Sequence, residues 1–273
     1  MEVLQYDFMQ RALLAAVLVG LAAPSVGIFL VQRRLALMGD GMGHVALTGV
    51  ALGLLTGWAP VWVALVTAAA GAVTIELLRD RGRTTSDLAL AIMFYGGIAG
   101  GVVLISKAPG GSAASLNQYL FGAITTTTSQ DLAVFAILAL LILVVTLGLG
   151  RHLFAVANDE EYARASGLPV LPLNLVLAVL TATTVVVSMR VVGLLLISAL
   201  MVVPVATAQL VARSFRSALA LSLAIGLGCA VVGVTASYYT NTPSGGSIVL
   251  TAIALFAATA LVTGLWRGVR RTA

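Results

Sequence analysis

The chain has 273 residues, of which 60% are hydrophobic and only 9% are charged. A soluble domain carries about 25% charged residues because its surface faces water, so most of the surface of this chain must face lipid. The net charge of +5 does not indicate a nucleic-acid partner, because the cations lie at the ends of apolar runs and form no basic stripe with aromatic residues. The single cysteine excludes a disulfide framework within the chain.

The apolar runs predict an all-α, polytopic transmembrane bundle with about nine spans, eight being possible. A spanning helix needs about 20 apolar residues, and these runs are too long and unbroken for the alternating strands of a β-barrel. We expect residues 1–273 to form a single transmembrane domain. The predicted spans are 10–31, 42–57, 60–78, 87–106, 130–150, 170–189, 192–212, 217–239 and 247–266.

The arginines and the lysine predict the orientation of these spans. With the N-terminus outside and nine alternating spans, 12 of the 15 Lys and Arg residues fall inside, and Arg11, Lys107 and Arg190 fall outside. Cytoplasmic loops carry the cationic excess. The prediction is therefore a multi-pass protein of the plasma (inner) membrane with its N-terminus outside and its C-terminus in the cytoplasm.

Asp40 and His44 are the first polar pair along the chain that suggests a chemical role. They are four residues apart in a small-residue segment that leads into the second span, so on a helix they share a face. An ionisable residue in a membrane segment usually faces a cavity, a partner or an ion, and carboxylate with imidazole suits Zn²⁺ and Mn²⁺. Two alternatives stay open: Asp40, six residues past Arg34, caps the helix at the interface, or His44 bonds to a neighbouring carbonyl.

Residues 155–169 (AVANDEEYARASGLP) are predicted to form a short amphipathic helix on the inner side. Asn158 or Asp159 suits the N-cap, and Gly167 followed by Pro169 suits the end. By itself this pattern is also compatible with an ordinary solvated loop between two spans.

Four segments together resemble the membrane permease of ABC-type zinc/manganese importers, the ABC-3 family. They are RRLALMGDGMGHVALTGVALG (33–53), NDEEYARASGLP (158–169), VGLLLISALMVVPVATAQLVAR (192–213) and NTPSGGSIVL (241–250), and they follow one another in the order of the family. The resemblance implies an ABC importer permease fold over the whole chain. It also implies that Asp40 and His44 line the path of the metal.

The resemblance further implies which residues and partners couple transport to ATP. Asp159, Glu161, Ala163 and Gly167 match the family's D-x-E-x-A-x-x-x-G segment, which contacts the ATPase. The implied partners are a second copy of the chain, ATP-binding cassette subunits and an extracytoplasmic metal-binding protein. The chain itself is expected to bind no cofactor and to be no enzyme, because its sole lysine is Lys107 and no G-x-x-x-x-G-K-[ST] loop is present.

Other functions remain open at this point. One is a gradient-driven secondary transporter, although its coupling usually needs acids at the membrane midplane. Another is an ABC permease for chelated iron or a vitamin, which needs no metal-ligand pair. Neither the choice among zinc, manganese and iron nor a role for Glu76 or Asp131 in ion passage follows from the sequence.

Overall fold

The computed structural model of the chain describes residues 7–82, 86–108, 119–122 and 128–272, and helices make up nearly all of this part. The helices are α1 (Asp7–Gln32), α2 (Met38–Thr56), α3 (Pro60–Asp80), α4 (Ser86–Lys107), α6 (Ser129–Gly148), α7 (Gly150–Asn158), α8 (Glu160–Ala165), α9 (Val170–Met189), α10 (Leu194–Val211), α11 (Phe215–Thr240) and α12 (Ser244–Thr272).

Each of the nine predicted spans coincides with a helix of the structure. Within the described residues, eight helices are long and apolar enough to cross a membrane. The remaining predicted span is α10, and its apolar part, Leu196–Val211, is shorter than that of the other eight helices. The predicted number of about nine is therefore approximate, and the all-α class is confirmed.

Local signals in the sequence set several helix ends. Pro60 occupies the first position of α3, where its missing N–H is not needed. Gly57 ends α2 with a φ of +73°, a left-handed conformation that costs glycine little. Thr128 and Asp131 form a reciprocal capping box at the start of α6.

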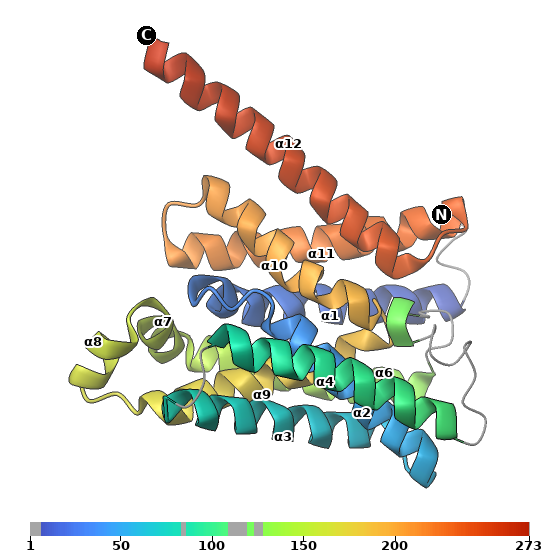
Figure 1. Ribbon diagram of the computed structural model, residues 1–273. Coiled ribbons are helices and arrows are strands. Elements are labelled where there is room, and N and C mark those ends of the chain that lie inside the picture. The colour runs from blue at the N-terminus through green and yellow to red at the C-terminus, as the bar shows by residue number, and fades with distance from the viewer. Residues whose placement is uncertain (1–6, 83–85, 109–118, 123–127, 273) are drawn as a thin grey trace.

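The bundle has a buried centre made of α1, α2 and α9. The most apolar stretches of these three helices are 72%, 67% and 72% buried, whereas that of α12 is only 17% buried. α1 packs against α6, α9, α10 and α11, while α2 packs against α3, α4, α9 and α10. α12 contacts α10 and α11 and then diverges from the body of the molecule (Figure 1).

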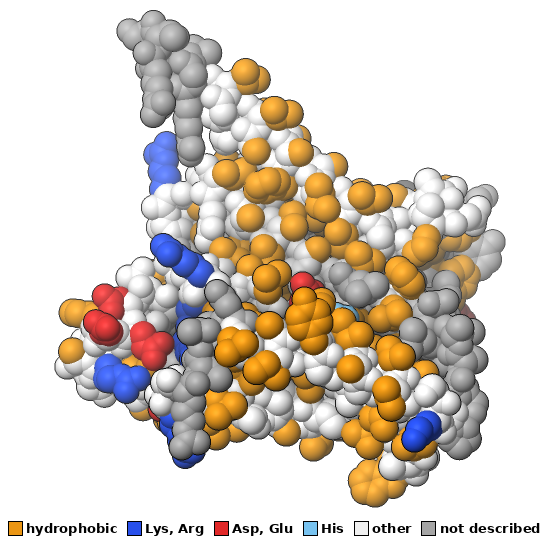
Figure 2. Space-filling view, in the orientation of Figure 1, with side chains coloured by type: hydrophobic (Ala, Val, Ile, Leu, Met, Phe, Trp, Pro, Cys, Tyr) orange, Lys and Arg blue, Asp and Glu red, His pale blue; other side chains and the backbone are white. Residues whose placement is uncertain are grey.

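The outer surface is divided between an apolar body and a charged end. Large hydrophobic side chains of α3, α4, α6 and α12 are exposed. Figure 2 shows hydrophobic side chains across the face of the bundle that α3, α4 and α12 form. Charged side chains gather mainly toward the end at which α7 and α8 lie (Figures 1 and 2). A surface of this kind fits a protein that crosses the membrane several times.

Ion pairs show which helix ends lie together. Arg33, just after α1, and Arg79, in the last turn of α3, both approach Glu160 of α8. A further ion pair joins Asp131, in the first turn of α6, to Arg190, at the end of α9. The ends of α1 and α3 therefore lie together beside α8, and the start of α6 lies beside the end of α9.

Candidate functional site

Asp40 lies in the first turn of α2, and it does not cap the helix. The N-cap position is Leu37, and no side chain there accepts a hydrogen bond. The Asp40 side chain is half-buried and makes no hydrogen bond or ion pair within the described part of the chain. Its carboxylate is close to the positive end of the α2 dipole.

His44 lies one turn further along α2 and is buried. Only 6% of the residue is exposed, and its Nδ1 has no hydrogen-bond partner among the described residues. This nitrogen therefore makes no bond to a neighbouring carbonyl. The ring instead contacts Phe94 of α4 edge to face, with the ring centres 4.5 Å apart. A buried ring nitrogen without a partner is costly, and a bound cation would satisfy it.

Close backbone contact between α2 and α4 positions the imidazole. A methyl group at Gly97 of α4 would lie 2.5 Å from the carbonyl carbon of His44, so only glycine permits this approach. Thr48 Oγ1 donates a hydrogen bond to the Gly97 carbonyl at 2.8 Å, which ties the two helices together at the same level. The His44–Phe94 contact is therefore set by the spacing between α2 and α4.

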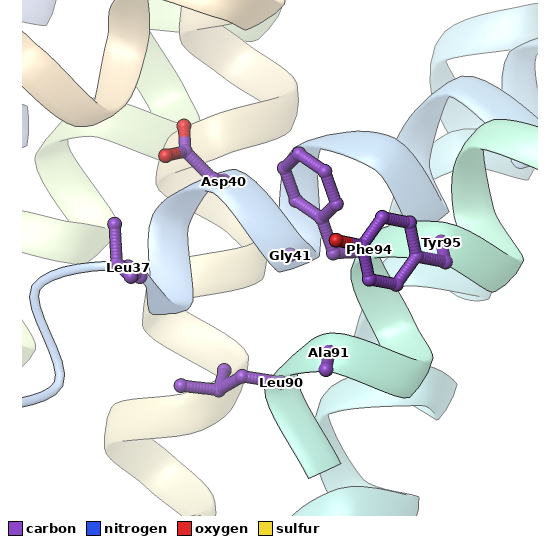
Figure 3. Close-up of a pocket in the computed structure, with 7 residues that line it drawn as sticks. All are labelled: Leu37, Asp40, Gly41, Leu90, Ala91, Phe94 and Tyr95. Atoms are coloured by element: carbon purple, nitrogen blue, oxygen red, sulfur yellow. The ribbon is translucent and has the colours of Figure 1, made fainter. Parts of the chain in front are cut away.

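A pocket of about 420 Å³ opens beside Asp40. Figure 3 shows the Asp40 carboxylate on one side of it and two aromatic rings of α4 on the other. The lining residues are Leu37, Asp40, Gly41, Leu90, Ala91, Phe94 and Tyr95. Asp40 is the charged member of this set. His44 is not among the described lining residues, and Phe94, which contacts it, forms part of the wall.

One copy of the chain provides few ligands around this pair. Within the described residues there is no group of three or more His, Cys, Asp and Glu side chains that could hold a metal. Protein-bound zinc usually has four ligands, one of which is often water in a functional site. Asp40 and His44 therefore make half of such a set.

The segment predicted to couple transport to ATP forms α8, preceded by a separate helix, α7, that the sequence did not predict. Asp159 is the N-cap of α8 and accepts a hydrogen bond from the Tyr162 amide at 2.9 Å. Glu161 is exposed, Ala163 is buried against the bundle, and Gly167 follows the helix with a φ of +81°. The four motif residues thus hold different positions: one caps the helix, one faces out, one packs inward and one ends the segment.

The ABC 3 transport family matches residues 5–263. The chain belongs to that family. Two similar proteins are the manganese transport system membrane protein MntC of Halalkalibacterium halodurans, 32% identical over 98% of this chain and 94% of the relative, and the manganese import system permease protein ScaB of Streptococcus gordonii, 33% identical over 92% and 90%. A chain of PsaBC from Streptococcus pneumoniae in complex with Fab superposes with a TM-score of 0.85, at 33% identity over 94% of this chain and 92% of that chain.

Two further acids of this ABC 3 family chain are held by arginines. Asp131 accepts from the Thr128 amide at 3.1 Å, as expected of a helix cap, and also pairs with Arg190. Glu76 is buried in α3, with its Oε1 2.6 Å from Arg79 Nη2. Each carboxylate therefore has a structural partner.

Sequence reasoning missed two features of the site. Phe94 was not singled out, because a phenylalanine in an apolar run gives no signal of its own. The family pattern indicates Glu161, whereas Glu160 is the acid that makes ion pairs.

Proposed function

We propose that this chain is the membrane-spanning permease subunit of an ATP-driven importer of divalent transition-metal ions, manganese or zinc. The observation that carries the proposal is the unpartnered, buried Nδ1 of His44 one helical turn from Asp40 in a membrane helix. Carboxylate and imidazole together suit both metals. The names of MntC and ScaB, which refer to manganese, favour that ion.

The proposal includes a second copy of the chain. The pocket beside Asp40 is open and bordered by exposed apolar side chains, with Leu37 at 68% and Tyr95 at 70% exposure. A carboxylate in such a surface would be costly against lipid. A second copy would cover the pocket and bring two carboxylates and two imidazoles around one axis, which completes the half-set of ligands.

The proposed importer also needs an ATPase and a protein that delivers the ion. Residues 1–273 act as one permease domain without a cofactor, while a separate cassette subunit hydrolyses ATP and an extracytoplasmic protein delivers the ion. In this scheme α8 meets the ATPase on the cytoplasmic side, so the N-terminus lies outside and the C-terminus inside. The four motif residues each contribute to α8. Asp159 caps its start, and Glu161 is an exposed charge. Ala163 packs against the bundle, and Gly167 ends the segment.

Reconstitution into liposomes with the ATPase and the binding protein tests this function. ATP-dependent uptake of radioactive manganese and zinc is measured for the wild type, Asp40→Asn, His44→Ala and His152→Ala. His152 is the chain's other histidine and is exposed on α7, so its variant serves as a matched control. We expect the first two variants to lose uptake with the complex intact, and the control to keep it.

Other results would point to other functions. Uptake that needs an ion gradient and no ATP would identify a secondary transporter. ATP-dependent uptake of a chelate or a vitamin that is unchanged by Asp40→Asn and His44→Ala would identify a different ABC permease and remove the metal site.

A further inference from the structure

Glu160 joins three separate elements at the charged end of the molecule. Its Oε2 lies 3.2 Å from Arg33 Nη2 and 3.7 Å from Arg79 Nη2. Arg79 Nη2 in turn lies 2.6 Å from Glu76 Oε1. α8 is thereby linked both to the connection between α1 and α2 and to the last turn of α3.

The members of this network on the bundle side are poorly exposed. The side chains of Arg33 and Glu76 are 7% and 3% exposed, whereas that of Glu160 is 39% exposed. Salt screens buried pairs much less than exposed ones, and removing one member leaves an uncompensated buried charge. Arg164 also approaches Glu160, at 3.5 Å, but it is 62% exposed and contributes little.

The charges of the network balance only when Glu160 is present. Burial and the neighbouring Arg79 lower the pKa of Arg33, while Glu76 and Glu160 raise it. An arginine nevertheless stays protonated at physiological pH. Two cations, Arg33 and Arg79, therefore face two carboxylates, and one of these comes from α8.

Both arginines connect to the helix that carries Asp40. Arg33 is in the tight connection between α1 and α2, seven residues before Asp40. This connection is held by a hydrogen bond from the Leu35 amide to the Leu30 carbonyl at 2.8 Å. Arg79 ends α3, which packs along α2. A displacement of α8 therefore acts on α2 from its start and from its flank.

We propose that Glu160 is a positioning residue for transport, which transmits movement of α8 to α2 through Arg33 and Arg79. The proposal rests on the proposed function, because it assumes that α8 moves with an ATPase. Glu161, the acid that matches the coupling motif, is exposed and makes no ion pair within the described residues. The two neighbouring acids thus have separate roles: Glu161 faces outward, and Glu160 binds the arginines of the bundle.

The experiment compares Glu160→Gln, Arg33→Gln, the double variant and Arg34→Gln in the reconstituted complex. Arg34 is the adjacent arginine, is exposed and has no ion pair in the described part of the chain, so it is the matched control. ATP-dependent manganese uptake, ATP hydrolysis and complex assembly are measured together. We expect each network variant to lose about tenfold in uptake, a common size of coupling between sites, while ATP hydrolysis persists. Arg34→Gln should behave as the wild type.

The double variant separates this role from a direct contact with the ATPase. Removing Glu160 and Arg33 together leaves Arg79 and Glu76 as a balanced pair. The loss should then be no larger than in either single variant, because residues that act through each other are not additive. Failure of Glu160→Gln to assemble, restored in the double variant, would also support the network. A loss near a hundredfold in the double variant would overturn the proposal.

Failure of this inference is distinct from failure of the proposed function. If wild-type uptake is lost in Asp40→Asn but Glu160→Gln matches Arg34→Gln, the importer stands and the role of Glu160 is wrong. If the wild type shows no ATP-dependent uptake, both proposals are wrong.

Discussion

Replacing Gly97 by alanine tests the contact on which the candidate site depends. The added methyl carbon would lie 2.5 Å from the carbonyl carbon of His44, and the neighbouring backbone atoms would lie at 2.7 and 2.8 Å. A Cβ atom essentially never lies within 3.0 Å of another non-bonded heavy atom, so α2 and α4 must separate by about 0.5 Å or more. Backbone atoms, unlike a flexible side chain, have no rotamer by which to move away.

The adjacent glycine provides the control for this change. A methyl group at Gly96 meets nothing within 4 Å, so Gly96→Ala gains helix propensity, about 0.5–1 kcal/mol, without a clash. Overpacking costs about 1–3 kcal/mol. The same propensity gain offsets part of this cost, so the net loss for Gly97→Ala should be up to about 2.5 kcal/mol. The separation should also weaken the His44–Phe94 contact.

The measurements are thermal unfolding of the purified chain in detergent and metal uptake in the reconstituted complex. We expect Gly97→Ala to lower the Tm and the uptake, and Gly96→Ala to preserve both. Equal Tm and equal uptake for the two variants would refute the close approach of α4 to His44.

Three further predictions concern the ends of the bundle. Arg190→Gln removes the ion pair with Asp131 and should lower the free energy of unfolding by up to about 1 kcal/mol, measured as a Tm shift. Asp131→Ala should cost about 1 kcal/mol more, because the cap of α6 is also lost. Asp159→Ala should speed tryptic cleavage after the exposed Arg164, whereas Asp159→Asn should keep the cap of α8 and the wild-type rate. Gly193→Ala should prevent folding, seen as loss of the monodisperse protein, because its φ is +95° and the methyl group would lie 2.4 Å from the Phe121 carbonyl carbon.

The spans and the Asp40–His44 pair were accessible from the sequence because both depend on local patterns. A run of apolar residues specifies a membrane helix by its length alone, and a separation of four residues specifies a shared helical face. The cap at Asp159 and the end at Gly167 depend on residues within the same short segment, and the structure shows both features.

The ion-pair network was not accessible in this way. Arg33, Arg79 and Glu160 are far apart in the sequence, and their contact depends on how α1, α3 and α8 pack. Glu160 and Glu161 are chemically identical neighbours, so only the orientation of α8 on the bundle distinguishes them. The same holds for Phe94, whose contact with His44 depends on the register between α2 and α4.

Both the contact that covers His44 and the ion pair that binds α8 involve α2 or the connection just before it. The pocket reaches Asp40, while Phe94 lies between the pocket and the buried His44 ring. For an ion to bind both ligands of the proposed pair, α2 must shift relative to α4 or the Phe94 ring must turn. Arg33 precedes α2 and is bound to α8 through Glu160, so in the proposed mechanism a movement of α8 would act on the helix whose shift would expose His44. The proposed ion path and the proposed coupling segment, which lie far apart in the sequence, are thus joined by one short connection.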